Sequence, residues 1–202
     1  VSEADIFALH LEAGQACVQI YFIRANQNWG NKAYYPKVDI DMSPSEVLEA
    51  FLGQFYLNRE PARILILSHT IANKELMKNL LTQKLGRRVQ IFIPEKGEKR
   101  DLVLDALRNA KESLAHKMAE SATQIKLLEA MVKAFGLKEF PKRIEVYDNS
   151  HIQGTHPVGA MIVSGTEGFL RSEYRIFNVR LDEIDNKDDV AMMKHVLARR
   201  FR

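Results

Sequence analysis

Short apolar runs alternate with amphipathic segments along the first two thirds of the chain. Residues 5–14 and 15–38 are rich in β-branched and aromatic residues, which predicts three strands, the second and third joined by a turn at NQNWGN. SPSEVLEAFLGQFY repeats its apolar residues at helical spacing, and Ser43, Pro44 and Glu46 form a typical capped helix start. The pattern then predicts a strand in ARILILSH, a helix ending at Gly86, a strand in RVQIFIPE and a long helix over 97–135.

The same kind of order begins again after GLKEFPKR, whose glycine and proline indicate a linker at 136–142. RIEVYDNSH predicts a strand, the residues around the turn GTEG predict two more, and DDVAMMKHVLARRF predicts a capped helix. Three antiparallel strands followed by alternating helices and strands are typical of ribonuclease H-like folds. We therefore predict an α/β protein. Residues 1–135 form a β-β-β-α-β-α-β-α ribonuclease H-like domain that ends in a long helix, and 143–202 form the first half, β-β-β-α, of a second one.

Composition narrows the class of protein only slightly. The 202 residues are 46% hydrophobic and 27% charged, as in ordinary globular proteins, and the net charge of +3 is compatible with nucleic acid without requiring it. Cys17 is the only cysteine, so a disulfide framework and a cysteine metal cluster are excluded, and its apolar surroundings predict a buried thiol. No apolar run approaches the roughly 18 residues of a membrane span. The start lacks the pattern of a signal peptide, and both ends suggest a piece of a longer protein.

Asp148 is the most informative single residue, because it follows the apolar run of RIEVYDNSH and precedes Asn149, Ser150 and His151. A carboxylate in apolar surroundings is costly unless something compensates for it. One interpretation is a turn in which Asp148 accepts hydrogen bonds from the backbone. The other is a ligand of a hard divalent cation, Mg²⁺ or Mn²⁺. The residues alone leave both open, whereas the spacing of His151 and His156 is unfavourable for zinc.

The motifs around Asp148 resemble the UvrC family, which belongs to the bacterial UvrABC excinuclease. The family pattern D-x-S-H, then G, then a strand K/R-x-x-Y-R-x-F-N is present here as Asp148, Ser150, His151, Gly154, Arg171, Tyr174, Arg175, Phe177 and Asn178. DDVAMMKHVLARRF, GQACVQIYFIRANQNWGNKAYYP, EVLEAFLGQFY and GEKRDLVLDALRNAKESL also resemble family segments, so the likeness covers essentially the whole chain.

The resemblance implies nucleotide excision repair in the bacterial cytoplasm. The family cuts damaged double-stranded DNA on both sides of a lesion handed over by UvrB, and the ribonuclease H-like domain makes the metal-dependent 5′ incision. Asp148 then corresponds to a catalytic metal ligand and Asp189 to a second catalytic aspartate, although Asp188 or Asp189 could equally cap the helix that follows. Asn149, Ser150 and His151 would position the site. The family pattern continues with D-G-G-K-G-Q and a later histidine that 1–202 lack, so we predict that this polypeptide alone does not cut DNA.

The first predicted domain, residues 1–135, differs from the second in its candidate site residues. Ser68 and His69 stand near the usual carboxylate position and Asp5 precedes its apolar run, so we predict no metal site there. Its basic residues suggest a module that positions DNA, but interspersed acidic residues also fit a solvated helix face. The candidate DNA-binding residues of the chain are Arg87, Arg88, Lys99, Arg100, Arg171 and Arg175.

Two further alternatives concern the aromatic residues and the function as a whole. Trp29, Tyr34 and Tyr35 either pack a hairpin onto the core or stack on unpaired bases. The chain as a whole is either part of the nuclease or a non-catalytic scaffold that binds DNA or UvrB. A different ribonuclease H-like enzyme, such as an exonuclease or integrase, is disfavoured by DNSHIQG and EYRIFNV.

Overall fold

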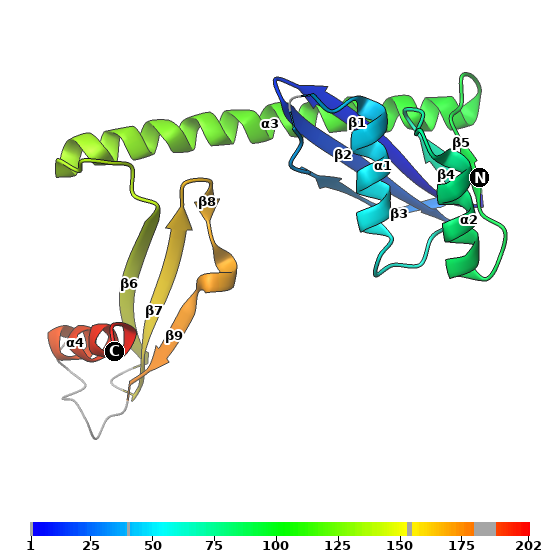
Figure 1. Ribbon diagram of the computed structural model, residues 1–202. Coiled ribbons are helices and arrows are strands. Elements are labelled where there is room, and N and C mark those ends of the chain that lie inside the picture. The colour runs from blue at the N-terminus through cyan, green and yellow to red at the C-terminus, as the bar shows by residue number, and fades with distance from the viewer. Residues whose placement is uncertain (1, 40, 153–154, 180–188) are drawn as a thin grey trace. The chain divides into compact units, whose positions relative to one another are not determined.

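A computed structural model describes residues 2–39, 41–152, 155–179 and 189–202. The chain forms two compact units, Val1–Met118 (the first unit) and Ala119–Arg202 (the second unit). Helix α3 (Glu98–Phe135) belongs to both, because the division falls inside it (Figure 1). The sequence predicts the domain boundary after this helix, in the linker at 136–142. Each unit has a sheet of its own.

The first unit has a five-stranded sheet in the order β3-β2-β1-β4-β5. Strands β1 (Glu3–Glu12), β2 (Gln15–Arg24) and β3 (Gln27–Tyr34) are antiparallel, and β4 (Ile64–Leu67) and β5 (Gln90–Phe92) run parallel to β1. Helix α1 (Pro44–Phe55) follows β3, and α2 (Lys74–Leu85) connects β4 to β5. The predicted order β-β-β-α-β-α-β-α and the predicted fold class are confirmed.

Alternation along β1 decides which helices cover which face of this sheet. Phe7 and Leu9 point into a core that includes Leu48 of α1 and Leu81 of α2. Ala4, Ile6 and Ala8 point into a second core that includes Val103 and Ala106 of α3. Alanines lie on both the strand side and the helix side of this second core. The sheet is therefore covered by α1 and α2 on one face and by the beginning of α3 on the other.

The predicted helix boundaries follow from local chemistry. Ser43 caps α1, with its side chain accepting from the Glu46 amide and the Glu46 carboxylate accepting from the Ser43 amide, which is a complete capping box. Gly86 ends α2 in the left-handed conformation, with φ of 68°. Both predictions are confirmed.

The predicted turn at 26–31 is wrong. The chain reverses at Ala25 and Asn26, whose φ values of 50° and 61° fit a two-residue hairpin turn. Strand β3 begins directly afterwards, and Trp29 is the extra residue of a bulge opposite Phe22 and Ile23. Because Ala25 is not a typical residue for a left-handed turn, while NQNWGN is rich in turn-forming residues, the sequence pointed to the wrong place.

The aromatic residues of this hairpin differ in their surroundings. Tyr34 packs against Phe51 and Phe55, with ring centroids 5.5 and 5.7 Å apart, so the core interpretation is correct for Tyr34. Trp29 is 73% exposed and Tyr35 is 43% exposed, so neither belongs to the core.

The second unit contains a smaller antiparallel sheet. Strands β6 (Arg143–Ile152) and β7 (Thr155–Gly165) pair along most of their length. The third predicted strand is divided into β8 (Gly168–Phe169) and β9 (Arg175–Asn178) by the 3-10 helix η1 (Arg171–Glu173), and both parts pair with β7. Helix α4 (Asp189–Arg200) packs on one face, where its Met192 and Val196 join a core with β7 and β9.

Candidate functional site

Asp148 lies inside a strand and not in a turn. Strand β6 continues through the polar residues to Ile152, and Asp148 pairs with Ala160 of β7. Its side chain is exposed and makes no hydrogen bond or ion pair with any other residue in the described ranges. The interpretation of Asp148 as a turn residue is therefore wrong. Its role as a metal ligand stays a prediction.

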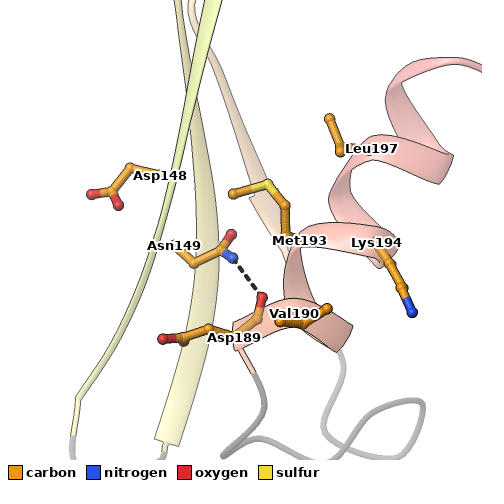
Figure 2. Close-up of a pocket in the computed structure, with 7 residues that line it drawn as sticks. All are labelled: Asp148, Asn149, Asp189, Val190, Met193, Lys194 and Leu197. Carbon is orange, nitrogen blue, oxygen red and sulfur yellow. Dashed lines mark hydrogen bonds between the residues drawn. The ribbon is translucent and has the colours of Figure 1, made fainter.

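Asp148 borders a pocket between strand β6 and helix α4, which we call the β6–α4 pocket. The pocket is lined by Asp148, Asn149, Asp189, Val190, Met193, Lys194 and Leu197. Because successive residues of a strand point to opposite faces, Asn149 points toward α4 while Asp148 points away from it (Figure 2). The pocket thus extends from the helix-covered face of β6 to the side where the Asp148 carboxylate lies.

Asn149 joins the strand to the beginning of the helix. Its amide nitrogen Nδ2 donates a hydrogen bond to the Asp189 carbonyl oxygen, at 3.2 Å (Figure 2). Its other amide atom, Oδ1, is buried and has no hydrogen-bond partner among the described residues. Asn149 therefore holds the first turn of α4 next to β6 and leaves an unused oxygen acceptor close by.

Asp189 is the first residue of α4, and its side chain is exposed. Its carboxylate extends from the helix back toward strand β6 (Figure 2). A negative charge in the first turn is favourable, because the helix dipole is positive there. The N-cap position precedes Asp189, and Asp188 lies outside the described residues. The structure therefore gives Asp189 a helix-dipole role in addition to its place in the pocket.

The donor chemistry of the pocket fits Mg²⁺ or Mn²⁺. The exposed donors are the carboxylates of Asp148 and Asp189, both hard oxygen ligands, whereas Asn149 Oδ1 is buried. Within the described parts of the chain, no three His, Cys, Asp or Glu side chains gather in a way that would hold a metal. Magnesium sites often need only one or two protein carboxylates together with water and substrate phosphates. The residues present thus match the kind of ion but supply only part of a coordination shell.

The remaining motif residues are described less fully. Ser150 is an exposed residue of β6 that pairs with Val158, and the strand register shifts between Ser150 and Ile152. His151 lies in the same strand, but its side chain, the side chain of His156 and residue Gly154 are outside the described part. The predicted positioning roles of Ser150 and His151 stay predictions. The zinc alternative concerns the side chains of His151 and His156, which lie outside the described part of the chain.

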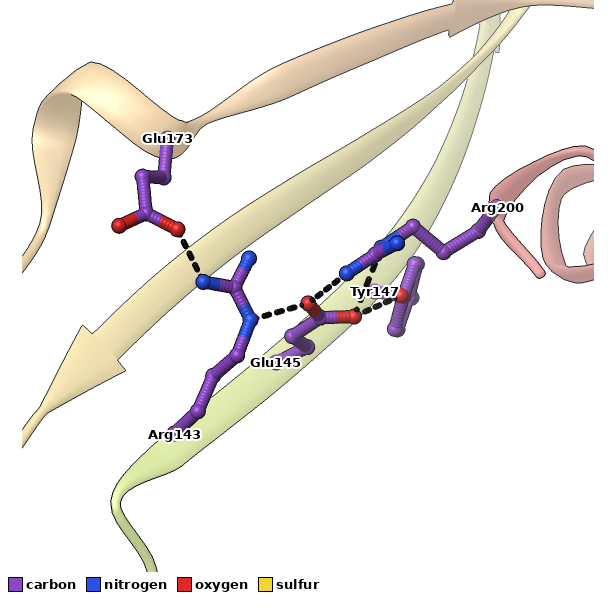
Figure 3. A network of polar contacts seen from close by, with 5 residues as sticks. All are labelled: Arg143, Glu145, Tyr147, Glu173 and Arg200. Atoms are coloured by element: carbon purple, nitrogen blue, oxygen red, sulfur yellow. Dashed lines mark hydrogen bonds and ion pairs between the residues drawn. The ribbon is translucent and has the colours of Figure 1, made fainter.

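The sequence reasoning missed a charged cluster on the α4 side of β6 (Figure 3). Glu145 accepts two hydrogen bonds from Arg200, at 2.6 and 3.1 Å, one from Arg143 Nε at 2.6 Å and one from the Tyr147 hydroxyl. Arg143 also pairs with Glu173 of η1. Hydrogen bonding from Arg200 is the main reason that the pKa of Glu145 falls to about 2. The cluster fixes the last turn of α4 on the strand that carries Asp148, and no local pattern in the sequence signals the pairing of Glu145 with Arg200.

The predicted DNA-binding residues do not form one patch. Arg88 lies with Ser2 and Glu3 at the starting ends of the parallel strands, whereas Arg100 lies with His10 and His69 at their finishing ends. Arg87 is exposed next to Arg88. The Lys99 ammonium stands over the Phe92 ring, 3.7 Å from its centroid. In the second unit, Arg171 (η1) and Arg175 (β9) are exposed.

Asp5 has a structural role in the first unit. It is 1% exposed and lies inside β1, and its carboxylate accepts from the Tyr56 hydroxyl at 2.7 Å and from the Ala62 amide at 3.3 Å. Arg24 forms an ion pair with it at 2.8 Å. Burial and the Asp5 charge raise the pKa of Tyr56 well above its usual value. These contacts compensate the buried charge and link β1, β2 and the end of α1.

The strand order of the first unit and the acidic pocket of the second define a protein of the ribonuclease H-like class. Family models support this and go further: residues 3–117 match the UvrC Ribonuclease H-like domain, and residues 132–202 match the UvrC RNAse H endonuclease domain. The chain belongs to the UvrC family.

Relatives named "UvrABC system protein C" match the entire chain. The identity is 62% for the protein from Ruegeria pomeroyi, 58% for that from Jannaschia sp. and 50% for that from Nitrobacter hamburgensis. The chain spans about a third of the length of these curated relatives, 32% of the first two and 29% of the third. None of the helices in the described ranges combines the length and hydrophobicity of a membrane span.

Proposed function

We propose that the chain is the central part of a UvrC subunit of the UvrABC excinuclease and acts in nucleotide excision repair in the bacterial cytoplasm. In this proposal, the second unit contributes to the metal-dependent 5′ incision of damaged double-stranded DNA delivered by UvrB. One observation carries the proposal. The exposed Asp148 carboxylate, which makes no ion pair within the described residues, borders the same pocket as Asp189.

Asp148 and Asp189 would hold Mg²⁺ or Mn²⁺ in the β6–α4 pocket. The bound ion would supply Lewis-acid stabilisation of phosphate charge and activation of water. Asn149 keeps the first turn of α4 beside β6, so that Asp189 stays near Asp148. Lys194 lines the same pocket and would attract a DNA phosphate by its charge.

The first unit has a supporting role in this proposal. Its buried Asp5 is engaged by Tyr56, Arg24 and the Ala62 amide, so this carboxylate is used for stability. Cations at both ends of its parallel strands, the exposed Arg88 and the partly buried Arg100, are suited to DNA phosphates. We assign the first unit to DNA positioning and the second to chemistry.

The proposal is tested in a protein long enough to contain a complete site. This chain replaces the matching third of the Ruegeria pomeroyi protein, and 5′ incision of a duplex with one lesion is measured with the partner proteins and Mg²⁺. Asp148→Asn is expected to reduce 5′ incision by about 100-fold or more, because a neutral amide is a weaker ligand for a hard cation, while DNA binding persists. Asp39→Asn, an exposed carboxylate of the first unit, is the matched control.

Incision by the Asp148→Asn chimera at the unmodified rate would contradict the assignment. A separate arm uses residues 1–202 alone, which are expected not to cut. Mg²⁺- or Mn²⁺-dependent cutting by this polypeptide, lost on Asp148→Asn, would overturn that expectation while supporting the metal site.

A further inference from the structure

The first unit contains a cavity at the finishing ends of β1 and β4, which we call the edge cavity. Its polar lining is formed by His10, Ser68, His69 and Arg100, and no carboxylate is among the described residues that line it. In α/β sheets, this edge of the parallel strands is the usual place for ligands. The chemistry of these four side chains therefore indicates what the edge cavity accepts.

Ser68 is fixed in place by the sheet. Strand β4 ends at Leu67, and the Ser68 amide donates to the Phe7 carbonyl oxygen at 2.9 Å. The Leu9 amide of β1 then donates to Ser68 Oγ at 2.9 Å. The hydroxyl oxygen thus accepts the hydrogen bond that a backbone carbonyl would otherwise accept in the ladder between the two strands. Because Oγ is engaged as part of this ladder, we interpret Ser68 as a positioning residue and not as a nucleophile.

Ser68 also contacts the His69 ring. Its Oγ lies 2.8 Å from His69 Nδ1. Oγ accepts from the Leu9 amide and can donate its own proton to Nδ1, and in that tautomer the neutral His69 ring carries its proton on Nε2. Burial and the charge of Arg100 lower the pKa of His69, so the neutral ring is the form present at pH 7. In the tautomer with the proton on Nε2, His69 offers one N–H donor to the cavity.

Arg100 supplies the charge. Arg100 is a partly buried residue, and its guanidinium has no ion pair or side-chain hydrogen bond within the described residues. The Glu12 carboxylate lies 3.1 Å from His10 Nε2 and pairs with it, so this nitrogen already has a partner. The edge cavity therefore combines a cation that has no ion pair among the described residues with a neutral ring that can donate through Nε2, which is the combination that a phosphate oxyanion needs.

We propose that the edge cavity binds one phosphate group through Arg100 and His69, with Ser68 as the positioning residue. This proposal rests on the proposed function, because nucleic acid would then supply the phosphate from its backbone. A contact of this kind fixes the register of a duplex without reading its sequence. Free phosphate has the same chemistry, and the experiment separates the two sources.

The experiment uses the full 202-residue chain and a duplex with an unpaired bubble, with binding measured by fluorescence anisotropy from about 50 to 200 mM salt. Arg100→Gln is expected to weaken binding several-fold for all DNA sequences. It should also reduce the slope of log K against log salt by about 0.9, the value for one phosphate contact. Ser68→Ala should weaken binding less and leave the slope nearly unchanged, because the guanidinium remains.

One matched arginine serves as the control, and a second arginine tests whether separate phosphate contacts add. Arg108 lies on the same helix but pairs with Asp105, so Arg108→Gln is expected to leave the salt slope unchanged. Arg88→Gln removes a cation at the opposite ends of the strands, and its effect should add to that of Arg100→Gln. Circular dichroism establishes that each variant is folded.

A second arm titrates inorganic phosphate and follows the His69 ring by nuclear magnetic resonance. A reduced salt slope in Arg100→Gln, with little response of the ring to millimolar phosphate, supports a backbone phosphate. A response to free phosphate without any change in the DNA salt slope contradicts nucleic acid as the source. The absence of both effects overturns the phosphate site. The proposed function is tested by incision of the Asp148→Asn chimera and the phosphate site by the salt slope of Arg100→Gln, so the failure of one proposal is distinguishable from the failure of the other.

Discussion

At the scale of single residues, Gly159 determines how closely helix α4 approaches the sheet. It pairs with Asn149 in the register of β6 and β7. A Cβ atom at this position would stand 2.5 Å from Val196 Cγ2 and 3.3 Å from Asn149 Oδ1. Val196 is fully buried and β-branched, so it cannot turn aside easily. The missing side chain of Gly159 therefore makes room for the contact that places Asp189 beside β6.

Gly159→Ala is expected to destabilise the second unit by about 1–3 kcal/mol, the usual cost of overpacking a well-filled core. Hydrogen exchange of the β6 and β7 amides in the full chain measures the effect. Gly53→Ala is the matched control, because Gly53 lies in α1 with nothing within 4 Å of the added atom. That change should be neutral or slightly stabilising. If Gly159→Ala behaves like the control, or if Val196→Ala does not relieve its effect, the explanation by close packing is wrong.

At the scale of elements, α4 is held on β6 at both of its ends. Asn149 holds its first residue and Glu145 holds Arg200 in its last turn. The Glu145 side chain is only 12% exposed, and three donors surround it. Paired hydrogen bonds between an arginine and a carboxylate also fix geometry. The position of Asp189 relative to Asp148 therefore depends on residues that take no part in the proposed chemistry.

This arrangement predicts a pH-dependent loss of stability in the second unit. The folded-state pKa of Glu145 is lowered to about 2, below the value of about 4.3 in unfolded chains. Its contribution is therefore fully present above about pH 5 and is lost as the pH falls from there toward 2. Glu145→Gln should cost about 1–2 kcal/mol at pH 7 and almost nothing at pH 2. Urea unfolding of both proteins across this range is the measurement, and a difference that is independent of pH would contradict the assignment.

The elements were more predictable than the contacts between them. Helix α1 has its start signal within Ser43, Pro44 and Glu46, and β1 has its alternation, so local patterns were sufficient for both. The hairpin turn at Ala25 was missed because its left-handed backbone is imposed by the two strands and not by the residue. Asp148 stood out as a charge in an apolar run. The pairing of Glu145 with Arg200 joins residues 55 positions apart, and nothing local in the sequence specifies it.

At the scale of the whole molecule, each of the two units has its own hydrophobic core. Phe7 and Leu48 belong to a core of the first unit, and Met161 and Val196 belong to that of the second. The Asp5 cluster lies inside the first unit and the Glu145 cluster inside the second. Helix α3 contributes residues to both units. Whether the units unfold separately therefore depends on whether this helix transmits a loss of structure from one to the other.

Because the two cores are separate, we predict that a destabilising substitution affects only the unit that contains it. Tyr56→Phe removes the hydroxyl that donates to buried Asp5, which should cost the first unit about 1–3 kcal/mol. Hydrogen exchange in the full chain should then quicken in β1 and β4 and remain unchanged in β7. Gly159→Ala should produce the reverse pattern, which makes each variant the control for the other. If either change quickens exchange in both sheets equally, α3 couples the two units into one cooperative structure, and the assignment of DNA positioning and chemistry to separate units would need to include that coupling.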